Sequence, residues 1–208
     1  MFGEVRMEDT RAARREGTRE RILRAAWHLA RRDGLAALTL REVARLVGMR
    51  APSLYTYFGS KNAMYDAMYT QAALELAATL AGRPQRTDPR QTLRGRMRLF
   101  SGFCAADPVR YQLLLERPIP GFEPAPESFQ ITAAALAATR ADLESAGARG
   151  KPALDMFRAL VTGLVSLQIA NDPGGDRWIG LQDDALDMLL AHYATPARGA
   201  GRHPGKGR

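Results

Sequence analysis

The segment TLREVARLVGMRAPSLYTYF, residues 39–58, decides the fold of the N-terminal part of this chain. Its apolar spacing predicts a short helix over residues 40–47 and a second helix over residues 51–58. Gly48 ends the first helix, and only a tight turn separates it from the second. Two short helices joined by a turn that contains glycine are typical of a helix-turn-helix motif.

The second helix has an outer face unlike that of an ordinary surface helix. Leu54 and Phe58 are four positions apart, so they share one side of the helix, which we expect to be buried. The opposite side carries small groups, hydroxyls and phenols in place of charges. Such a face can lie on the floor of a DNA groove, where hydroxyls reach base edges and phosphates. The residues of this face are Pro52, Ser53, Tyr55, Thr56 and Tyr57.

The positive charge of the chain is concentrated toward its N-terminus. The 208 residues carry a formal net charge of +8, and residues 1–61 hold 13 Lys/Arg against 7 Asp/Glu. Residues 62–195 hold 13 against 15, and residues 196–208 add 4 basic residues. A basic N-terminal third followed by a slightly acidic remainder suggests a polyanion as partner. A solvated, arginine-rich surface is the alternative that charge alone leaves open.

Composition and motifs exclude several classes of protein. With 46% hydrophobic and 25% charged residues, the chain is not disordered throughout. Cys104 is the only cysteine, which excludes an internal disulfide and a cysteine-rich zinc site, and the three histidines lack metal-ligand spacing. No nucleophile or cofactor motif is present, and the cluster Asp183, Asp184 and Asp187 fits a helix N-terminus better than an acid–base site. We therefore expect no enzyme, no metal and no cofactor.

The rest of the chain is predicted to be helical as well. Residues 118–127 hold 4 prolines, which predicts an extended loop because proline lacks the N–H that helices and sheets need. Neither a membrane-length apolar run nor a signal-peptide core is found, so we expect a cytoplasmic protein without a membrane partner. Further helices are expected over residues 18–33, 61–80, 89–106, 108–117, 128–146, 153–171 and 181–194.

Residues 18–69, TRERILRAAWHLARRDGLAALTLREVARLVGMRAPSLYTYFGSKNAMYDAMY, resemble the DNA-binding domain of tetracycline-repressor-like (TetR) regulators. The resemblance rests on a helix that ends in Gly34 and on a T-x-R-x-x-A opening that begins at Thr39. It also rests on the core G-x-x-x-P-S-L-Y-x-x-F over residues 48–58, with Ser-Lys two residues beyond it. The remainder of the chain resembles the family much less closely.

The resemblance implies an all-α homodimer with an N-terminal three-helix helix-turn-helix DNA-binding head joined to a helical ligand-binding and dimerisation body. Its implied function is ligand-responsive transcription regulation, with repression as the family default. The implied partners are a palindromic double-stranded DNA operator and a small apolar or amphipathic effector. A helical adaptor or scaffold without sequence-specific DNA binding is the alternative. The expected divisions are a flexible basic arm (1–17), the head (18–69), the body (70–195) and a disordered tail (196–208).

Carried over position by position, the resemblance assigns roles to residues of the head. Arg50 stands where a small polar residue is common, and it either reads a base or, as we prefer, adds a phosphate contact. Tyr57 replaces a histidine that many members carry. The base-reading candidates are Arg41, Ala51, Pro52, Ser53 and Tyr55. The phosphate candidates are Thr39, Tyr57 and Lys61.

Structural alternatives exist for several of these roles. Tyr55 could be a half-buried packing residue, Thr39 could serve only as a helix N-cap, and Arg41 could pair with a neighbouring acid. The arginines of the N-terminal arm could enter the minor groove or could simply be solvated. These are Arg6, Arg11, Arg14, Arg15 and Arg19.

The body holds apolar and aromatic residues that suggest an effector cavity, although each could equally belong to a plain core. The helix over 61–80 is the expected lever between head and body, and the loop 118–127, with Phe122, is the expected gate. Cys104 fits a small buried residue better than a redox sensor. The ligand-binding candidates are Met97, Phe100, Phe103, Cys104, Tyr111, Leu114, Phe122, Phe129, Phe157 and Leu160.

The last two helices carry more apolar residues than one monomer face would hide. Two such helix pairs from two subunits would form a four-helix bundle, which predicts a homodimer. The interface candidates are Leu164, Leu167, Leu186, Leu189, Leu190 and Tyr193.

Overall fold

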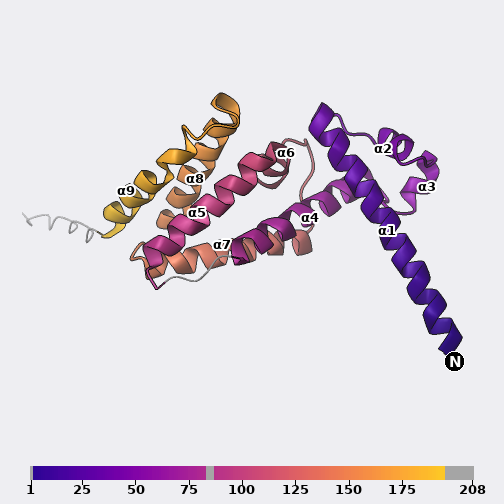
Figure 1. Ribbon diagram of the computed structural model, residues 1–208, viewed down its shortest axis with the longest axis horizontal. Coiled ribbons are helices and arrows are strands. Elements are labelled where there is room, and N and C mark those ends of the chain that lie inside the picture. The colour runs from indigo at the N-terminus through magenta and orange to yellow at the C-terminus, as the bar shows by residue number, and fades with distance from the viewer. Residues whose placement is uncertain (1, 83–86, 195–208) are drawn as a thin grey trace, which may run out of the picture. The chain divides into compact units, whose positions relative to one another are not determined.

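The computed structural model describes residues 2–82 and 87–194, with side chains described for 11–82 and 87–193, and every regular element in these ranges is helical (Figure 1). The predicted all-α class is confirmed. A π-helix, Gln112–Glu116, and a short 3-10 turn, Ile179–Leu181, complete the set. The helices are α1 (Phe2–Asp33), α2 (Leu40–Leu46), α3 (Ala51–Tyr55), α4 (Lys61–Ala81), α5 (Pro89–Ala106), α6 (Pro108–Tyr111), α7 (Pro126–Ser145), α8 (Lys151–Asn171) and α9 (Gln182–Ala194).

The chain forms two compact units. The first unit comprises Met1–Ala78 and Ala106–Ala133, and the second comprises Thr79–Ala105 and Ala134–Arg208. Residues 106–133, which the sequence assigns to the body, therefore belong to the same unit as the predicted DNA-binding head. The tail 196–208 lies outside the described residues.

The first unit has one apolar core shared by α1, α2, α3, α4 and the segment that follows α6. Ile22 and Leu54 are 0% exposed in it, and Phe122, far away in sequence, joins the same core. Gly34 ends α1 with φ +87°, a left-handed conformation that an L-residue adopts only with strain. The core explains why residues 106–133 group with the head, because their apolar side chains are buried there.

α1 begins at Phe2, so the predicted start of this helix at Thr18 is wrong. The segment is rich in arginine, glutamate and alanine, which are strong helix formers and extend the helix without needing a core. Local contacts add to this, since the Thr18 hydroxyl donates to the Arg14 carbonyl at 3.0 Å and Arg19 pairs with Glu16 at 3.7 Å. The basic segment expected to be a flexible arm is thus a continuation of α1.

The second unit is held by an apolar core and by ion pairs between its helices. Leu93, Met97 and Phe157 form part of the core. Arg96, 6% exposed, donates from Nε to Asp142 at 2.9 Å and so ties α5 to α7. Charged pairs of this kind restrict how the helices of the unit can pack. The core also includes Leu143, Leu186, Leu189 and Leu190.

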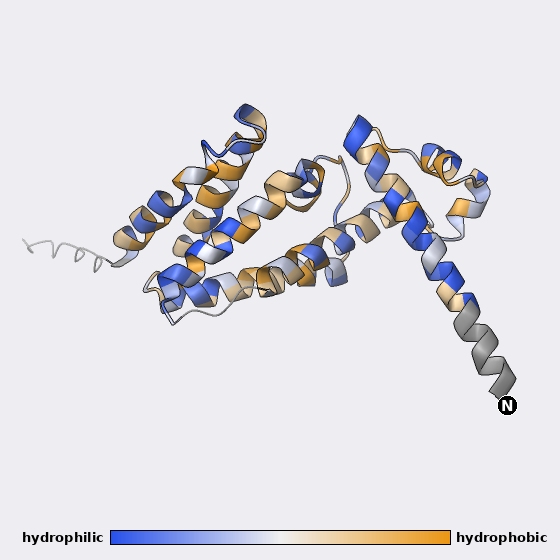
Figure 2. Ribbon diagram, viewed as in Figure 1, coloured by the Kyte–Doolittle hydropathy of each residue, from blue (hydrophilic) through white to orange (hydrophobic). Residues whose placement is uncertain are grey.

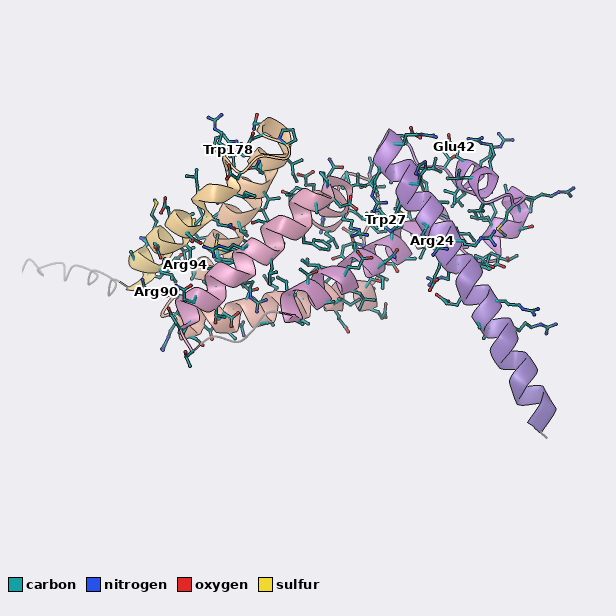
Figure 3. The ribbon with its side chains drawn as sticks, viewed as in Figure 1. Arg24, Trp27, Glu42, Arg90, Arg94 and Trp178 are labelled. Atoms are coloured by element: carbon teal, nitrogen blue, oxygen red, sulfur yellow. The ribbon has the colours of Figure 1, made fainter. Side chains whose placement is uncertain are left out.

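The acidic residues at the start of α9 serve as ion-pair partners. Arg94, labelled in Figure 3, donates to both carboxylate oxygens of Asp187 at 2.8 and 2.7 Å, and Arg98 pairs with Asp183. These contacts join α5 to α9. The acidic cluster thus has a structural role in this unit.

Three of the predicted dimer residues are buried within their own chain. Leu186, Leu189 and Leu190 are 1–3% exposed in the core of the second unit, so their assignment to a subunit interface is corrected. The spacing of apolar residues along α9 does not separate core positions from interface positions, because one helix can present apolar residues both to its own unit and to a partner. Leu164 and Tyr193 are half-buried, and Leu167, 39% exposed, and Met188, 74% exposed, are among the exposed apolar side chains of α8 and α9.

Candidate nucleic-acid interface

The helix-turn-helix is built by local capping. The Glu42 N–H donates to the Thr39 hydroxyl oxygen at 3.2 Å, and that hydroxyl bonds the Glu42 carboxylate at 2.9 Å. This capping interaction, predicted from the sequence, fixes the start of α2. Gly48, with φ +71°, turns the chain, and the Met49 N–H donates to the Ala44 carbonyl at 2.8 Å.

α3 buries one side and exposes the other, as the sequence predicts. Leu54 is 0% and Phe58 2% exposed, whereas Tyr55 is 53% exposed. Regular helix ends at Tyr55, earlier than expected, and Thr56 to Phe58 continue as a turn in which the Thr56 hydroxyl donates to the Ser53 carbonyl at 2.7 Å. Tyr55 is therefore not a packing residue.

Pro52 stands in the first turn of α3, where its missing N–H costs nothing. Pro52 and Ser53 are exposed beside Tyr55, and Ala51 is half-buried. The motif thus presents a continuous surface of small and hydroxyl-bearing side chains.

Two arginines flank this surface. Arg41, in the first turn of α2, and Arg50, the N-cap residue of α3, are both exposed. Arg41 forms no ion pair with any side chain in the described ranges, so its predicted pairing with a neighbouring acid is not seen. Glu42, labelled in Figure 3, directs its carboxylate to Thr39 instead.

Three predicted phosphate contacts already have partners within the chain. Thr39 caps α2, which supports the capping alternative for this residue. The Lys61 ammonium donates to the Ala36 carbonyl at 3.2 Å and lies 5.3 Å from the centre of the Tyr65 ring. Tyr57 is half-buried against the core of the first unit. A phosphate contact by Thr39, Lys61 or Tyr57 would therefore be made in addition to these contacts within the chain.

Arginines of α1 lie against the same motif, which the sequence did not reveal. Arg15 Nη2 donates to the Thr56 carbonyl at 3.2 Å, and Arg21 Nη2 donates to the Val47 carbonyl at 3.4 Å. Arg19 places its guanidinium 5.2 Å from the centre of the Phe58 ring. The basic run was a visible signal, but only the folded chain shows which carbonyls it reaches.

The sequence profile described as "Bacterial regulatory proteins, tetR family" matches residues 22–68, which are the three helices just described and the start of α4. Residues 22–68 are therefore similar to the DNA-binding domain of the tetR family. This part of the chain has the helix-turn-helix DNA-binding domain that transcription regulators carry.

Similar proteins agree with this assignment. The HTH-type transcriptional regulator Rv1816 of Mycobacterium tuberculosis is 28% identical over 124 residues, which cover 56% of this chain and 53% of that protein. The chain thus spans about half the length of the curated relatives that it matches.

Solved structures show the shared fold. A structure described as that of a regulatory protein, SCO4313, is 24% identical, with a TM-score of 0.71 over 86% of this chain and 98% of that one. The multidrug binding protein EbrR, complexed with imidazole, is 20% identical, with a TM-score of 0.60 over 87% of this chain and 92% of that one.

The predicted effector-binding residues are divided between the two units. Phe122 is packed in the first unit, its ring centre 5.5 Å from that of Tyr65, while Phe129 is 56% exposed. In the first unit lie Tyr111, Leu114, Phe122 and Phe129, and in the second lie Met97, Phe100, Phe103, Cys104, Phe157 and Leu160.

Cys104 is buried, and its burial raises the pKa of the thiol to about 12. A thiol with that pKa stays protonated at neutral pH, and the thiolate is the reactive form. This favours the small buried residue over the redox sensor. Among the described residues, no three His, Cys, Asp or Glu side chains gather as metal ligands would.

A polar anchor attaches α4 to α7 and was not foreseen. The Asp66 carboxylate accepts the Ala125 N–H at 2.8 Å and the Ser128 hydroxyl at 3.0 Å. Thr70 donates to Ser128 at 2.9 Å, and Tyr69 bonds Thr132 at 2.9 Å. The loop expected to be a gate is therefore fixed to α4 at its far end. A lone aspartate on an apolar helix was the available signal.

A second anchor surrounds Trp27, labelled in Figure 3, on α1. Its indole N–H donates to the Gln71 side chain at 2.9 Å, and the guanidinium groups of Arg31 and Arg110 lie 5.4 and 5.8 Å from its ring centre. Both arginines contact Asp107, and Arg110 also pairs with Glu75 at 2.6 Å. α1, α4 and α6 are thus joined by one cluster of charged and aromatic groups.

Proposed function

We propose that this chain is a ligand-responsive transcription regulator that binds a near-palindromic operator as a homodimer. Its default action is repression, and a small apolar or amphipathic effector releases it. The observation that carries the proposal is α3, which buries Leu54 and exposes Pro52, Ser53 and Tyr55 on a face where the described residues place no acidic side chain. Operator binding also places the protein in the cytoplasm.

In this proposal α3 enters the major groove and Arg41 reads a guanine. An arginine that is exposed and free of ion pairs can donate two hydrogen bonds to O6 and N7 of guanine, the commonest base-specific contact. Two heads in a dimer would read half-sites about 34–36 Å apart, one turn of the duplex. Arg50 supplies a phosphate contact beside α3.

Dimerisation is supported by the apolar residues that α8 leaves exposed. By length and composition α8 could cross a membrane, but a single helix of this kind is weak evidence for a membrane span. Only 28% of its apolar window is buried, and Figure 2 shows hydrophobic residues in orange along α8. Apolar surface that the chain itself leaves uncovered supports a protein interface at this helix. The proposed contacts are Leu164, Leu167, Met188 and Tyr193, beside the small residue Gly163.

Effector control needs a link between the ligand site and the head. Within the first unit, Phe122 packs on Tyr65, whose hydroxyl donates to the Leu35 carbonyl at 2.5 Å in the loop before α2. A ligand that displaces the loop 118–127 would therefore act directly on the head. The name of EbrR, a multidrug binding protein of the same fold, is consistent with such a ligand. The effector must bind the DNA-free form more tightly, and DNA then weakens it by the same factor.

The test is selection of a duplex from random DNA by the purified protein, followed by affinity measurement with variants. Arg41→Ala should relax preference at one position in each half-site and cost about 1–3 kcal/mol for each guanine that is no longer bound. Arg90→Ala, an exposed arginine of the second unit (Figure 3), is the matched control and should change nothing. Failure of the wild type to enrich any sequence would favour the adaptor alternative.

A further inference from the structure

We infer that the basic face of the α1 extension is a second DNA-binding element, which contacts backbone phosphates beside the site occupied by α3. This inference rests on the proposed operator binding and names a further surface for it. The face consists of Arg11, Arg14 and Arg15, which lie on one side of α1 because positions i, i+3 and i+4 of a helix are neighbours.

The extension has no apolar core of its own. Every residue from Arg11 to Gly17 is exposed, the two alanines included. Because the segment continues a helix whose other end is packed, it forms without such a core and its side chains stay exposed to a partner. A partner that neutralises its positive charge would stabilise it.

The fold fixes the direction of this face. Arg15 donates to the Thr56 carbonyl, one residue beyond α3, so the arginines point to the same side of the head as the recognition surface. Residues 11–24 hold six arginines against two glutamates, which matches a polyanion and opposes an acidic partner. Charge and placement together therefore favour DNA as the occupant.

The helical form decides the mode of contact. A helix with side chains is about 10–12 Å across, whereas the minor groove of B-DNA is about 6 Å wide. The minor-groove insertion considered for an extended arm therefore does not fit α1. Arginine guanidinium groups on the helix surface fit phosphate oxygens instead.

The test measures DNA affinity against salt concentration, with the duplex that the wild type selects from random DNA as probe. The double variant Arg11→Ala, Arg14→Ala should lower the slope of log affinity against log salt by about 2–4, at about 0.9 for each phosphate that the dimer no longer neutralises. Alanine keeps the segment helical, which circular dichroism checks. The double lysine variant should retain the slope, since it keeps the charges.

The matched control is Arg24→Ala. Arg24, labelled in Figure 3, is exposed on α1, about 140° around the helix from Arg11, and it lies ten positions, or about 15 Å, along the helix from Arg14. It should leave slope and affinity unchanged.

Three outcomes would overturn the inference. If the wild type selects a duplex, Tyr55→Ala abolishes that selection and the double alanine variant keeps the wild-type slope, the inference fails and the proposed function stands. If the wild type selects no duplex, both fail. If the double variant changes sedimentation but not the salt slope, the face joins copies of the chain instead.

Discussion

Replacing Asp66 by alanine should destabilise the first unit and leave the second unchanged. The carboxylate accepts two hydrogen bonds, from the Ala125 N–H at 2.8 Å and the Ser128 hydroxyl at 3.0 Å. A hydrogen bond to a charged group contributes about 1.5–3 kcal/mol, and because Asp66 is only half-buried we discount this to about 1–2 kcal/mol for each bond, or about 2–4 kcal/mol for both. With an m-value of about 1.5 kcal/mol/M in urea, the unfolding midpoint should fall by about 1.5–2.5 M.

The two tryptophans report on the two units separately. Trp27 lies in the first unit and Trp178 in the second, so a Trp178→Phe background follows the first unit by fluorescence and a Trp27→Phe background follows the second. Asp66→Asn is the matched control, because its amide oxygen retains one acceptor and should retain about half of the stability. An unchanged Trp27 transition, or equal shifts at both tryptophans, would refute the anchoring role of Asp66.

Four further outcomes follow from the structure. Met188→Glu places a charge on the exposed apolar face and should raise the dimer dissociation constant by about tenfold or more, or 1.4 kcal/mol, in sedimentation equilibrium; no change would remove α9 from the interface. Tyr55→Ala should abolish selective DNA binding while leaving the urea midpoint within about 0.5 kcal/mol of the wild type, because the side chain is 53% exposed. Burial raises the pKa of Cys104 to about 12 from an ordinary 9.0, so only the unfolded thiol ionises between these pH values. The free energy of unfolding should therefore fall as pH rises above 9.0. Urea titrations of the Cys104→Ala variant should show a smaller fall in the free energy of unfolding over the same pH range. A methyl group at Gly175 would overlap the Asp172 carboxylate, so Gly175→Ala should destabilise the second unit, and the destabilisation should be smaller in an Asp172→Ala background; an additive cycle would contradict this.

Local physics made the helix-turn-helix predictable. The cap at Thr39, the turn at Gly48 and the inward side of Leu54 depend on residues within a few positions of one another. The same is true of the proline loop, whose backbone cannot join a helix. The outer face of α3 could also be foreseen, since the buried positions of a short helix determine which positions remain exposed.

The prediction of where α1 begins and the prediction of the dimer residues were wrong for different reasons. Composition made the N-terminal segment look like an arm, although arginine, glutamate and alanine favour a helix as strongly as they favour solvent. The interface prediction included Leu186, Leu189 and Leu190, although they are buried in their own unit. The apolar face of a helix can be covered by the same unit or by a partner subunit, and the sequence pattern is the same in both cases. Burial is a property of the whole unit, so no local pattern separates a core face from an interface.

The sequence by itself determined the all-α class, the helix-turn-helix and the exposed face of α3, because each follows from capping, turn chemistry and helical spacing along a short stretch of chain. Only the tertiary structure decided that residues 106–133 share a core with the head, that Asp66 fixes the start of α7, and that Arg15 lies against the end of α3. These contacts join residues 41 to 59 positions apart. The groups that meet in these contacts are backbone atoms and common side chains, and no sequence pattern distinguishes them. The contacts therefore form only when the packed helices bring these groups together.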